Sequence, residues 1–218
     1  MPFTGIPAEA FDFYDALAAD NTKAFWAEHK ADYEQFVREP LVELGQDLAA
    51  DFGEPKLFRP YRDVRFSKDK TPIKDHQGMY VLMRNSVGWY VQISSAGLMV
   101  AGGWYESAPN QIAAYRQAVE ADRAGALATL VAGTAKKGFT IGGDQLKTRP
   151  QGMPADHPRI ELLRYRTLYA ERRWEPEAWM GTRRALTKVK QSWEKLTPLM
   201  TWFADHIPPA AVSRPRGS

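Results

Sequence analysis

The chain has 218 residues, of which 44% are hydrophobic and 25% charged, a composition typical of one folded globular domain. Because Cys is absent and the four His residues form no HxxxH pair, disulfides and cysteine catalysis are excluded, and we expect no metal site and no cofactor. The formal net charge of +3 is uneven: the first 51 residues carry −8, so the remaining 167 sum to +11.

The chain also lacks the marks of a membrane or secreted protein. No apolar run approaches the roughly 20 residues that span a bilayer. The first 22 residues contain no Lys or Arg and no apolar core of a secretory signal. We therefore expect a cytoplasmic protein with no membrane partner.

Two helices are predicted at the start of the chain. Apolar residues recur at helical spacing from Pro7 to Asp20, and Asn21-Thr22 then supplies a stop and a new N-cap. Pro40 should kink or break the second helix, because proline lacks the N–H and clashes with the preceding turn. The continuation ends near Gly53, so residues 1–52 form an acidic helical hairpin.

Three short runs rich in β-branched and aromatic residues follow, Met79–Arg84, Trp89–Ser94 and Leu98–Trp104. Their short connections favour antiparallel hairpins. Alternation places Tyr90 and Gln92 on one face of the second strand. Gly102-Gly103, near the end of the third, is more typical of a bulge or bend than of close approach to a ligand.

The second half of the chain alternates helices with loops. We expect helices from an N-cap at Ser107, over 122–132 and after Pro158, and a mostly loop segment over 133–154 with a short strand near 139–141. Leu168–Trp174 is extended, and a long C-terminal helix runs from about Pro176 to His206 with a candidate interruption at Pro198.

These elements predict an α+β fold. An antiparallel meander of about four to six strands packs against several helices, with the N-terminal helical hairpin and the long C-terminal helix among them. Residues 1–207 form a single domain, and residues 208–218 have the composition of a flexible tail.

The segment from Arg59 to Pro72 has the most unusual composition, since residues 56–74 contain seven basic and two acidic side chains. If Tyr61–Phe66 is a strand, Arg62 shares an apolar face with Val64 and Phe66. An Arg on such a face must find a carboxylate, several carbonyl groups or a ligand anion, because an unpaired buried charge is very costly.

Two interpretations of this segment are open. Guanidinium groups suit bidentate contacts to phosphate or carboxylate, so the segment favours an anion site in which Asp63 orients an Arg or acts as a base. A loop over 67–78 would then bring its lysines over the ligand. Alternatively, the charges form a structural Arg–Asp network that ties this strand to its neighbours.

The same segment resembles the signature of domain-of-unknown-function family 2461, a bacterial and fungal group of uncharacterised proteins of about this length. The pattern R-x-x-R-D-x-R-F-x-x-[D/N]-K-x-P-Y matches from Arg59 to Pro72, and Ile73 replaces its final Tyr. The resemblance covers nearly the whole chain, including Phe25-Trp26 and Asp156-His157-Pro158. It implies kinship without an activity.

Asp156-His157-Pro158 has two interpretations of its own. Asp156 or His157 followed by Pro158 is typical of a helix N-cap. Alternatively, His157 is a general acid or base near the Arg cluster, with Lys147 as another anion contact.

The sequence favours a pocket for a phosphorylated or carboxylated small molecule, with or without catalysis. Its ligand-binding residues would be Arg59, Arg62, Arg65, Lys68, Lys70 and Lys147, and its catalytic residues Asp63 and His157. One alternative is a nucleic-acid-binding module that uses the basic body, as the pI of about 9.0 allows. Another is a structural or partner-binding domain in which the Arg/Asp motif is scaffold.

Overall fold

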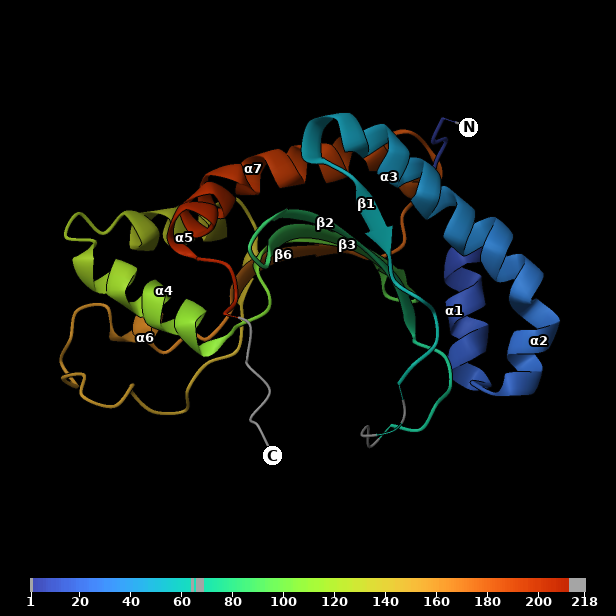
Figure 1. Cartoon of the computed structure of the whole chain (residues 1–218). Helices are drawn as coiled ribbons and strands as arrows, with labels where there is room; N and C mark the ends of the chain where they lie inside the picture. Colours follow the sequence, from blue (N-terminus) through green and yellow to red (C-terminus); the bar gives the residue numbers. More distant parts are fainter. Residues whose placement is uncertain (1, 64, 66–68, 212–218) are drawn as a thin grey trace. The chain divides into compact units, whose positions relative to one another are not determined.

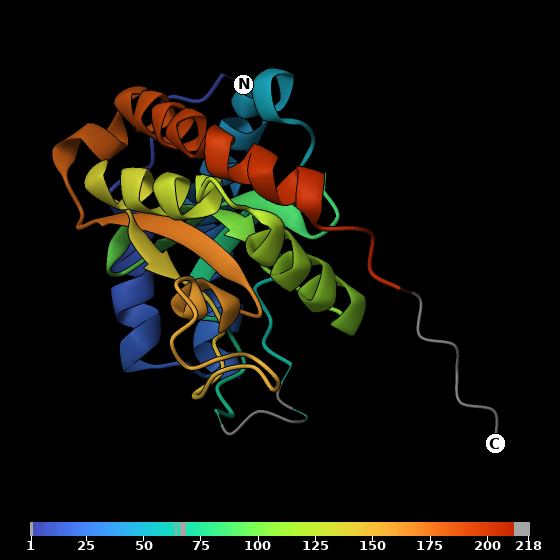
Figure 2. The same ribbon diagram turned by 90° about the vertical axis from the view of Figure 1, so that its left-hand side faces the viewer.

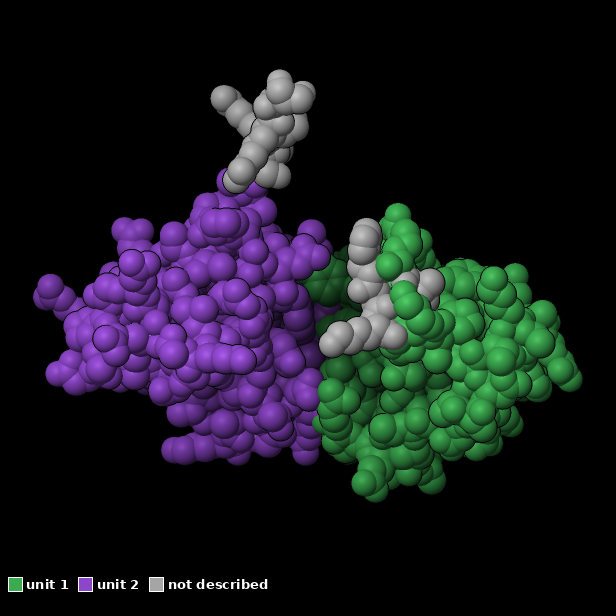
Figure 3. Space-filling model, turned by 90° about the horizontal axis from the view of Figure 1, so that it is seen from below, with its two compact units in different colours: residues 1–81, 90–100, 173–193 green, residues 82–89, 101–172, 194–218 purple. Residues whose placement is uncertain are grey.

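The computed structural model describes residues 2–63, 65 and 69–211. It divides into two compact units, shown in separate colours in Figure 3. Unit 1 comprises residues 1–81, 90–100 and 173–193, and unit 2 comprises residues 82–89, 101–172 and 194–218. The central strands and the last helix pass from one unit into the other.

The strands form one six-stranded antiparallel sheet, as the sequence predicts. They are β1 (Pro55–Leu57), β2 (His76–Arg84), β3 (Val87–Ser94), β4 (Gly97–Trp104), β5 (Thr140–Gly142) and β6 (Leu168–Trp174). The order is β1-β2-β3-β4-β6-β5, so the first four strands form a meander and β6 lies between β4 and β5. Figure 2 shows the short β5 beside β6.

The helices complete the α+β fold (Figure 1). They are α1 (Glu9–Ala19), α2 (Lys23–Asp32), the π-helix η1 (Tyr33–Arg38), α3 (Glu39–Phe52), α4 (Pro109–Ala121), α5 (Ala126–Lys136), α6 (Ile160–Leu163), the 3-10 helix η2 (Ala178–Gly181) and α7 (Arg184–His206). Within the described ranges, no helix combines the length and the apolar character that a bilayer crossing requires.

Of the kink or break predicted at Pro40, the structure shows no break, because a π-helical turn leads directly into α3. The preceding π-helical turn lets the Glu39 N–H bond to the carbonyl of Glu34, five residues back. The wider turn accommodates a residue that has no N–H and whose ring crowds the carbonyl four residues earlier. The second predicted helix is therefore a continuous succession of α2, η1 and α3, capped at its start by the Thr22 hydroxyl.

Other predicted boundaries also moved. Ala108, not Ser107, precedes α4, and the Gln111 side chain accepts a hydrogen bond from the Ala108 N–H. α5 lies at 126–136 rather than 122–132, because the Asp122 carboxylate caps it by accepting from the first N–H groups. α7 starts at Arg184 rather than near Pro176 and continues through Pro198 without interruption.

The core of unit 1 lies between its helices and its part of the sheet. Gly45 of α3 faces Met79 of β2 so closely that a Cβ would lie 2.7 Å from the methionine sulfur. Trp193 of α7 packs edge-to-face on Phe52 and donates from Nε1 to the carbonyl of Tyr90. Gly45 of α3 and Trp193 of α7 therefore face the sheet.

In unit 2 the glycine pair of β4 allows close packing on both faces. A Cβ on Gly102 would lie 3.0 Å from atoms of Leu196 and Met200 in α7. A Cβ on Gly103 would lie 2.4 Å from the Cα of Tyr169 in the neighbouring strand β6. The pair thus has a packing role within the sheet and under the helix.

We expect Gly103→Ala to lower the free energy of unfolding by about 1–3 kcal/mol, because its methyl group meets backbone that cannot give way. Gly133→Ala is the matched control: Gly133 lies inside α5 with nothing within 4 Å of an added Cβ. There Ala should raise stability by about 0.5–1 kcal/mol through helix propensity. Urea unfolding of the two variants tests this; equal effects would contradict the packing role.

Candidate functional site

In the part of the Arg-rich segment that the structure describes, Tyr61 and Arg62 belong to a short hairpin stem, and residues 61–63 form no continuous strand. Tyr61 and Ile73 form an isolated antiparallel bridge. The Arg62 N–H donates to the Pro72 carbonyl at 2.9 Å, and the Lys74 N–H donates to the Pro60 carbonyl at 2.8 Å. Val64 and Phe66 lie outside the described residues, so the apolar face predicted around Arg62 is not described.

The stem is held at its Ile73 side by the turn between α1 and α2. The Asn21 side-chain amide donates to the Ile73 carbonyl at 3.0 Å and accepts from the Ile73 N–H at 3.2 Å. The Ile73 side chain is buried. These contacts fix the backbone just before Lys74 and Asp75, whose side chains lie near Arg62.

A buried Gln holds the other end of the stem. Gln77 in β2 is 1% exposed, and its Oε1 accepts from the Tyr33 hydroxyl at 2.6 Å. Its Nε2 donates to the carbonyls of Phe58 and Gly78 at 2.6 and 3.0 Å. The π-helix is thereby connected through one side chain to the backbone just before Arg59. The predicted loop over 67–78 ends before His76, where β2 begins.

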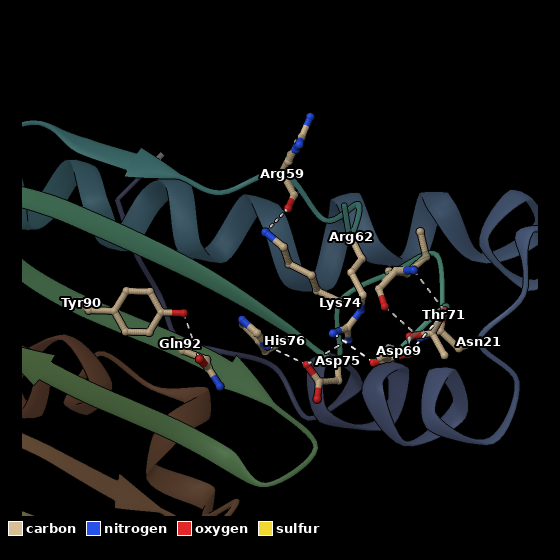
Figure 4. Close-up of polar contacts among 11 residues, drawn as sticks. Asn21, Arg59, Arg62, Asp69, Thr71, Lys74, Asp75, His76, Tyr90 and Gln92 are labelled. Carbon is tan, nitrogen blue, oxygen red and sulfur yellow. Dashed lines mark hydrogen bonds and ion pairs between the residues drawn. The ribbon is translucent and has the colours of Figure 1, made fainter. Parts of the chain in front are cut away.

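Arg62 lies at the centre of a charge network. Its Nη1 is 3.1 Å from Asp69 Oδ2, and its Nη2 is 3.9 Å from Asp75 Oδ1. Asp75 also pairs with His76 Nδ1 at 2.7 Å (Figure 4). The Arg62 side chain is 25% exposed. The sequence predicts that Arg62 pairs with a carboxylate, several carbonyl groups or a ligand anion. In the structure its partners are carboxylates.

Lys74 approaches the same region from the other strand of the stem. Its ammonium donates to the Arg59 carbonyl at 3.0 Å and lies 5.5 Å from the centroid of the Phe58 ring. Burial and the positive charges of Arg59 and Arg62 lower the pKa of Lys74. The Arg59 guanidinium points away from the other labelled side chains and has no ion-pair partner among the described residues (Figure 4).

Arg65 belongs to a separate ion pair at the surface. Its Nε and Nη2 donate to the two oxygens of Asp63 at 3.0 and 2.7 Å. The hydrogen bonds from the Arg65 side chain and backbone lower the pKa of Asp63. A carboxylate held ionised in this way is a weak proton acceptor near neutral pH. Lys70 is exposed, and Lys68 lies outside the described residues.

β3 carries a hydrogen-bonded pair of residues that lies outside the Arg-rich motif. The Tyr90 hydroxyl donates to Gln92 Oε1 at 2.9 Å (Figure 4). The Tyr90 hydroxyl lies over Gly78, where an added Cβ would be 2.2 Å from the Tyr90 oxygen. Burial raises the pKa of Tyr90 to about 12, and Arg173 and Asp75 are close enough to contribute in opposite directions. Strand alternation in the sequence was the one signal for this pair.

Lys147 and His157 belong to unit 2. Lys147 is exposed, and its carbonyl accepts from Arg164 Nη2 at 3.3 Å. The His157 Nδ1 accepts from the Arg159 N–H at 3.1 Å, just before α6 begins at Ile160. The N-cap of α6 is Arg159, with no side-chain cap hydrogen bond, so neither Asp156 nor His157 takes the predicted N-cap position. Among the basic residues of the Arg-rich segment, the structure brings Arg62 and Lys74 to one stem. Arg65 pairs with Asp63 instead, and the Arg59 guanidinium points away from the stem.

The described ranges contain no group of three or more His, Asp or Glu side chains placed to hold a metal ion. Residues 9–202 match the family model described as Conserved hypothetical protein (DUF2461), and the chain belongs to that family. A search of curated proteins and a search of solved structures each gave no match.

Tyr33→Phe should lower the free energy of unfolding by about 1–3 kcal/mol, because it leaves the buried acceptor of Gln77 without its donor. Tyr61→Phe is the control: the Tyr61 hydroxyl accepts from Trp26 Nε1, but Tyr61 is 48% exposed and water can replace it. Denaturant unfolding of both variants makes the comparison. Equal losses would show that the Tyr33–Gln77 bond does not specifically anchor the stem.

Proposed function

We propose that unit 1 binds a small phosphorylated or carboxylated molecule through Arg62 and Lys74. One observation carries the proposal: two partly buried cations on one hairpin stem have partners that an incoming anion can replace. The longer ion pair of Arg62, at 3.9 Å, is with Asp75, whose side chain is 75% exposed. Lys74 donates to a neutral carbonyl.

The electrostatics of Lys74 favour an anion at this place. Burial and two like charges lower its pKa, so the charged ammonium is disfavoured in its surroundings. A phosphate or carboxylate beside it stabilises the charged form and relieves the repulsion from Arg59 and Arg62. The Arg62 guanidinium adds a planar pair of donors suited to two oxygens of the same anion.

The remaining site residues take secondary roles in the proposal. Arg59 attracts the anion without contact, because its guanidinium points away from the stem (Figure 4). Arg65 is already paired with Asp63, so it adds little charge. Ligand binding by Lys68, Lys70 and Lys147, and catalysis by Asp63 and His157, stay predictions from the sequence.

Titration of the whole chain with inorganic phosphate at low ionic strength, followed by NMR or calorimetry, tests the site. We expect Lys74→Gln to weaken binding about 5- to 10-fold, because a hydrogen bond to a charged group is lost. Asp75→Asn should strengthen binding, because it removes the carboxylate that competes for Arg62.

Arg65→Gln is the matched control, since it also removes one positive charge from the same segment. Its affinity for phosphate should stay within about twofold of the original chain, because Arg65 is exposed and pairs with Asp63 rather than contacting the anion, and an exposed charge without contact has a small effect. Loss of affinity in all three variants, or no phosphate binding by the original chain, contradicts the proposal. An equal loss in Lys74→Gln and Arg65→Gln would indicate attraction by net charge alone, as the nucleic-acid alternative expects.

A structural role for the motif is the second candidate, and the contacts of the stem favour it. Arg62 connects Asp69 and Asp75, which lie on either side of the Ile73 position held by Asn21. A guanidinium placed in this way closes the loop between the two sides of the stem. Both roles can hold for one residue, and they differ in what an added anion does.

Thermal unfolding of Arg62→Met separates the two roles. A structural role alone predicts a loss of about 1–2 kcal/mol, modest because the side chain is partly exposed, and no response to phosphate in either protein. The proposed anion site predicts that phosphate raises the melting temperature of the original chain more than that of Arg62→Met, because a ligand stabilises the state that binds it.

A further inference from the structure

A hollow lies in unit 1, between α1 and the continuous helix formed by α2 and η1. Its volume is about 310 Å³, and its lining contains none of the residues of the proposed anion site. A cavity of this size holds a small organic molecule. Its charged lining residues are mainly acidic, whereas the Arg62 stem is basic.

Three aromatic rings form the apolar part of the cavity, those of Phe13, Phe25 and Phe36. The Phe13 and Phe25 rings are tilted by 48° with centroids 6.1 Å apart, and Phe25 lies 4.3 Å from the His29 ring. Phe25 and Phe36 are both partly exposed, so their rings remain open to a ligand. The faces of such rings carry negative potential and attract cations.

Phe36 reaches the cavity from the π-helical turn. π-Helical turns are rare and occur frequently at functional sites. This turn also accommodates Pro40 in the helix, and it places Phe36 and Asp32 on the same wall of the cavity. The helical distortion therefore shapes the cavity as well as accommodating the proline.

Carboxylates form the polar part of the cavity. Glu9 and Asp12 line it from α1 and have no hydrogen-bond or ion-pair partner among the described residues. Asp32 lines it from α2 and pairs with His29 at 3.0 Å. Acidic residues in the first turn of α1 interact favourably with the helix dipole. This explains why the residues are negatively charged, but not why they lie beside three aromatic rings.

We propose that this cavity binds an organic cation, either a protonated amine or a quaternary ammonium group with an apolar body. The aromatic faces and the unpaired carboxylates both favour positive charge, and the apolar walls favour a body that excludes water. A bare metal ion does not fit, because the described residues offer no set of three ligands. Glu9 and Asp12 are exposed to solvent, so they act on the ligand through their charge, and a neutral apolar molecule gains no such attraction.

Benzyltrimethylammonium chloride is the probe, titrated into the whole chain and followed by NMR, with benzyl alcohol as the neutral comparison. We expect saturable shifts for the cation and weaker binding of the alcohol. Asp12→Asn and Phe25→Leu should each weaken cation binding about 2- to 5-fold, the effect of one charge or one ring at a partly exposed site.

Asp15→Asn is the matched control, because Asp15 lies on α1, is exposed and does not line the cavity. Its affinity for the cation should be unchanged. Glu9→Gln replaces Asp12→Asn if the latter fails to fold, and Lys74→Gln should not alter cation binding, so the test is independent of the anion site. Equal effects of Asp12→Asn and Asp15→Asn, benzyl alcohol binding as tightly as the cation, or no saturable binding would each overturn the proposal.

Discussion

The hydrogen bond from the Tyr33 hydroxyl to Gln77 joins the helical and sheet parts of unit 1. At 2.6 Å and fully buried, it connects the π-helix to the start of β2, and the Gln77 amide then holds the carbonyls of Phe58 and Gly78. A buried amide with its partners in place specifies one arrangement, because each alternative leaves a polar group without a partner. The positions of Arg59 and of the stem beyond it depend on this connection.

The same constraint relates the two proposed sites of unit 1. Tyr33 begins the π-helical turn that carries Phe36 to the acidic cavity, and its hydroxyl anchors the sheet end that carries the basic stem. Burial raises the pKa of Tyr33 far above its usual range, so the hydroxyl remains a donor at any ordinary pH. One helix thus positions a site for each sign of charge.

Charge pairing explains how an acidic segment and a basic segment share unit 1. Two carboxylates of α3 have basic partners near the C-terminus of the chain: Asp47 pairs at 3.2 Å with Arg183, the residue just before α7, and Asp51 pairs at 2.7 Å with Lys190 in α7. Figure 1 shows these helices beside each other. Within the motif, Asp69 pairs with Arg62 and Asp63 pairs with Arg65. Asp75, just beyond the motif, contributes one further negative charge near Arg62.

The sequence by itself determined the α+β class, the antiparallel strands, the Leu168–Trp174 strand and the start of the second helix at Thr22. Each depends on local periodicity, short connections or a cap, which contacts near in sequence decide. It also singled out Arg62 as a residue that needs a carboxylate, several carbonyl groups or a ligand anion as its partner. Tertiary structure alone decided that the described part of the motif forms a short stem through Tyr61 and Ile73, and that Asp75 and His76 lie near Arg62. These outcomes depend on contacts between residues far apart in the chain, such as Asn21 with Ile73 and Tyr33 with Gln77, and no local pattern encodes them.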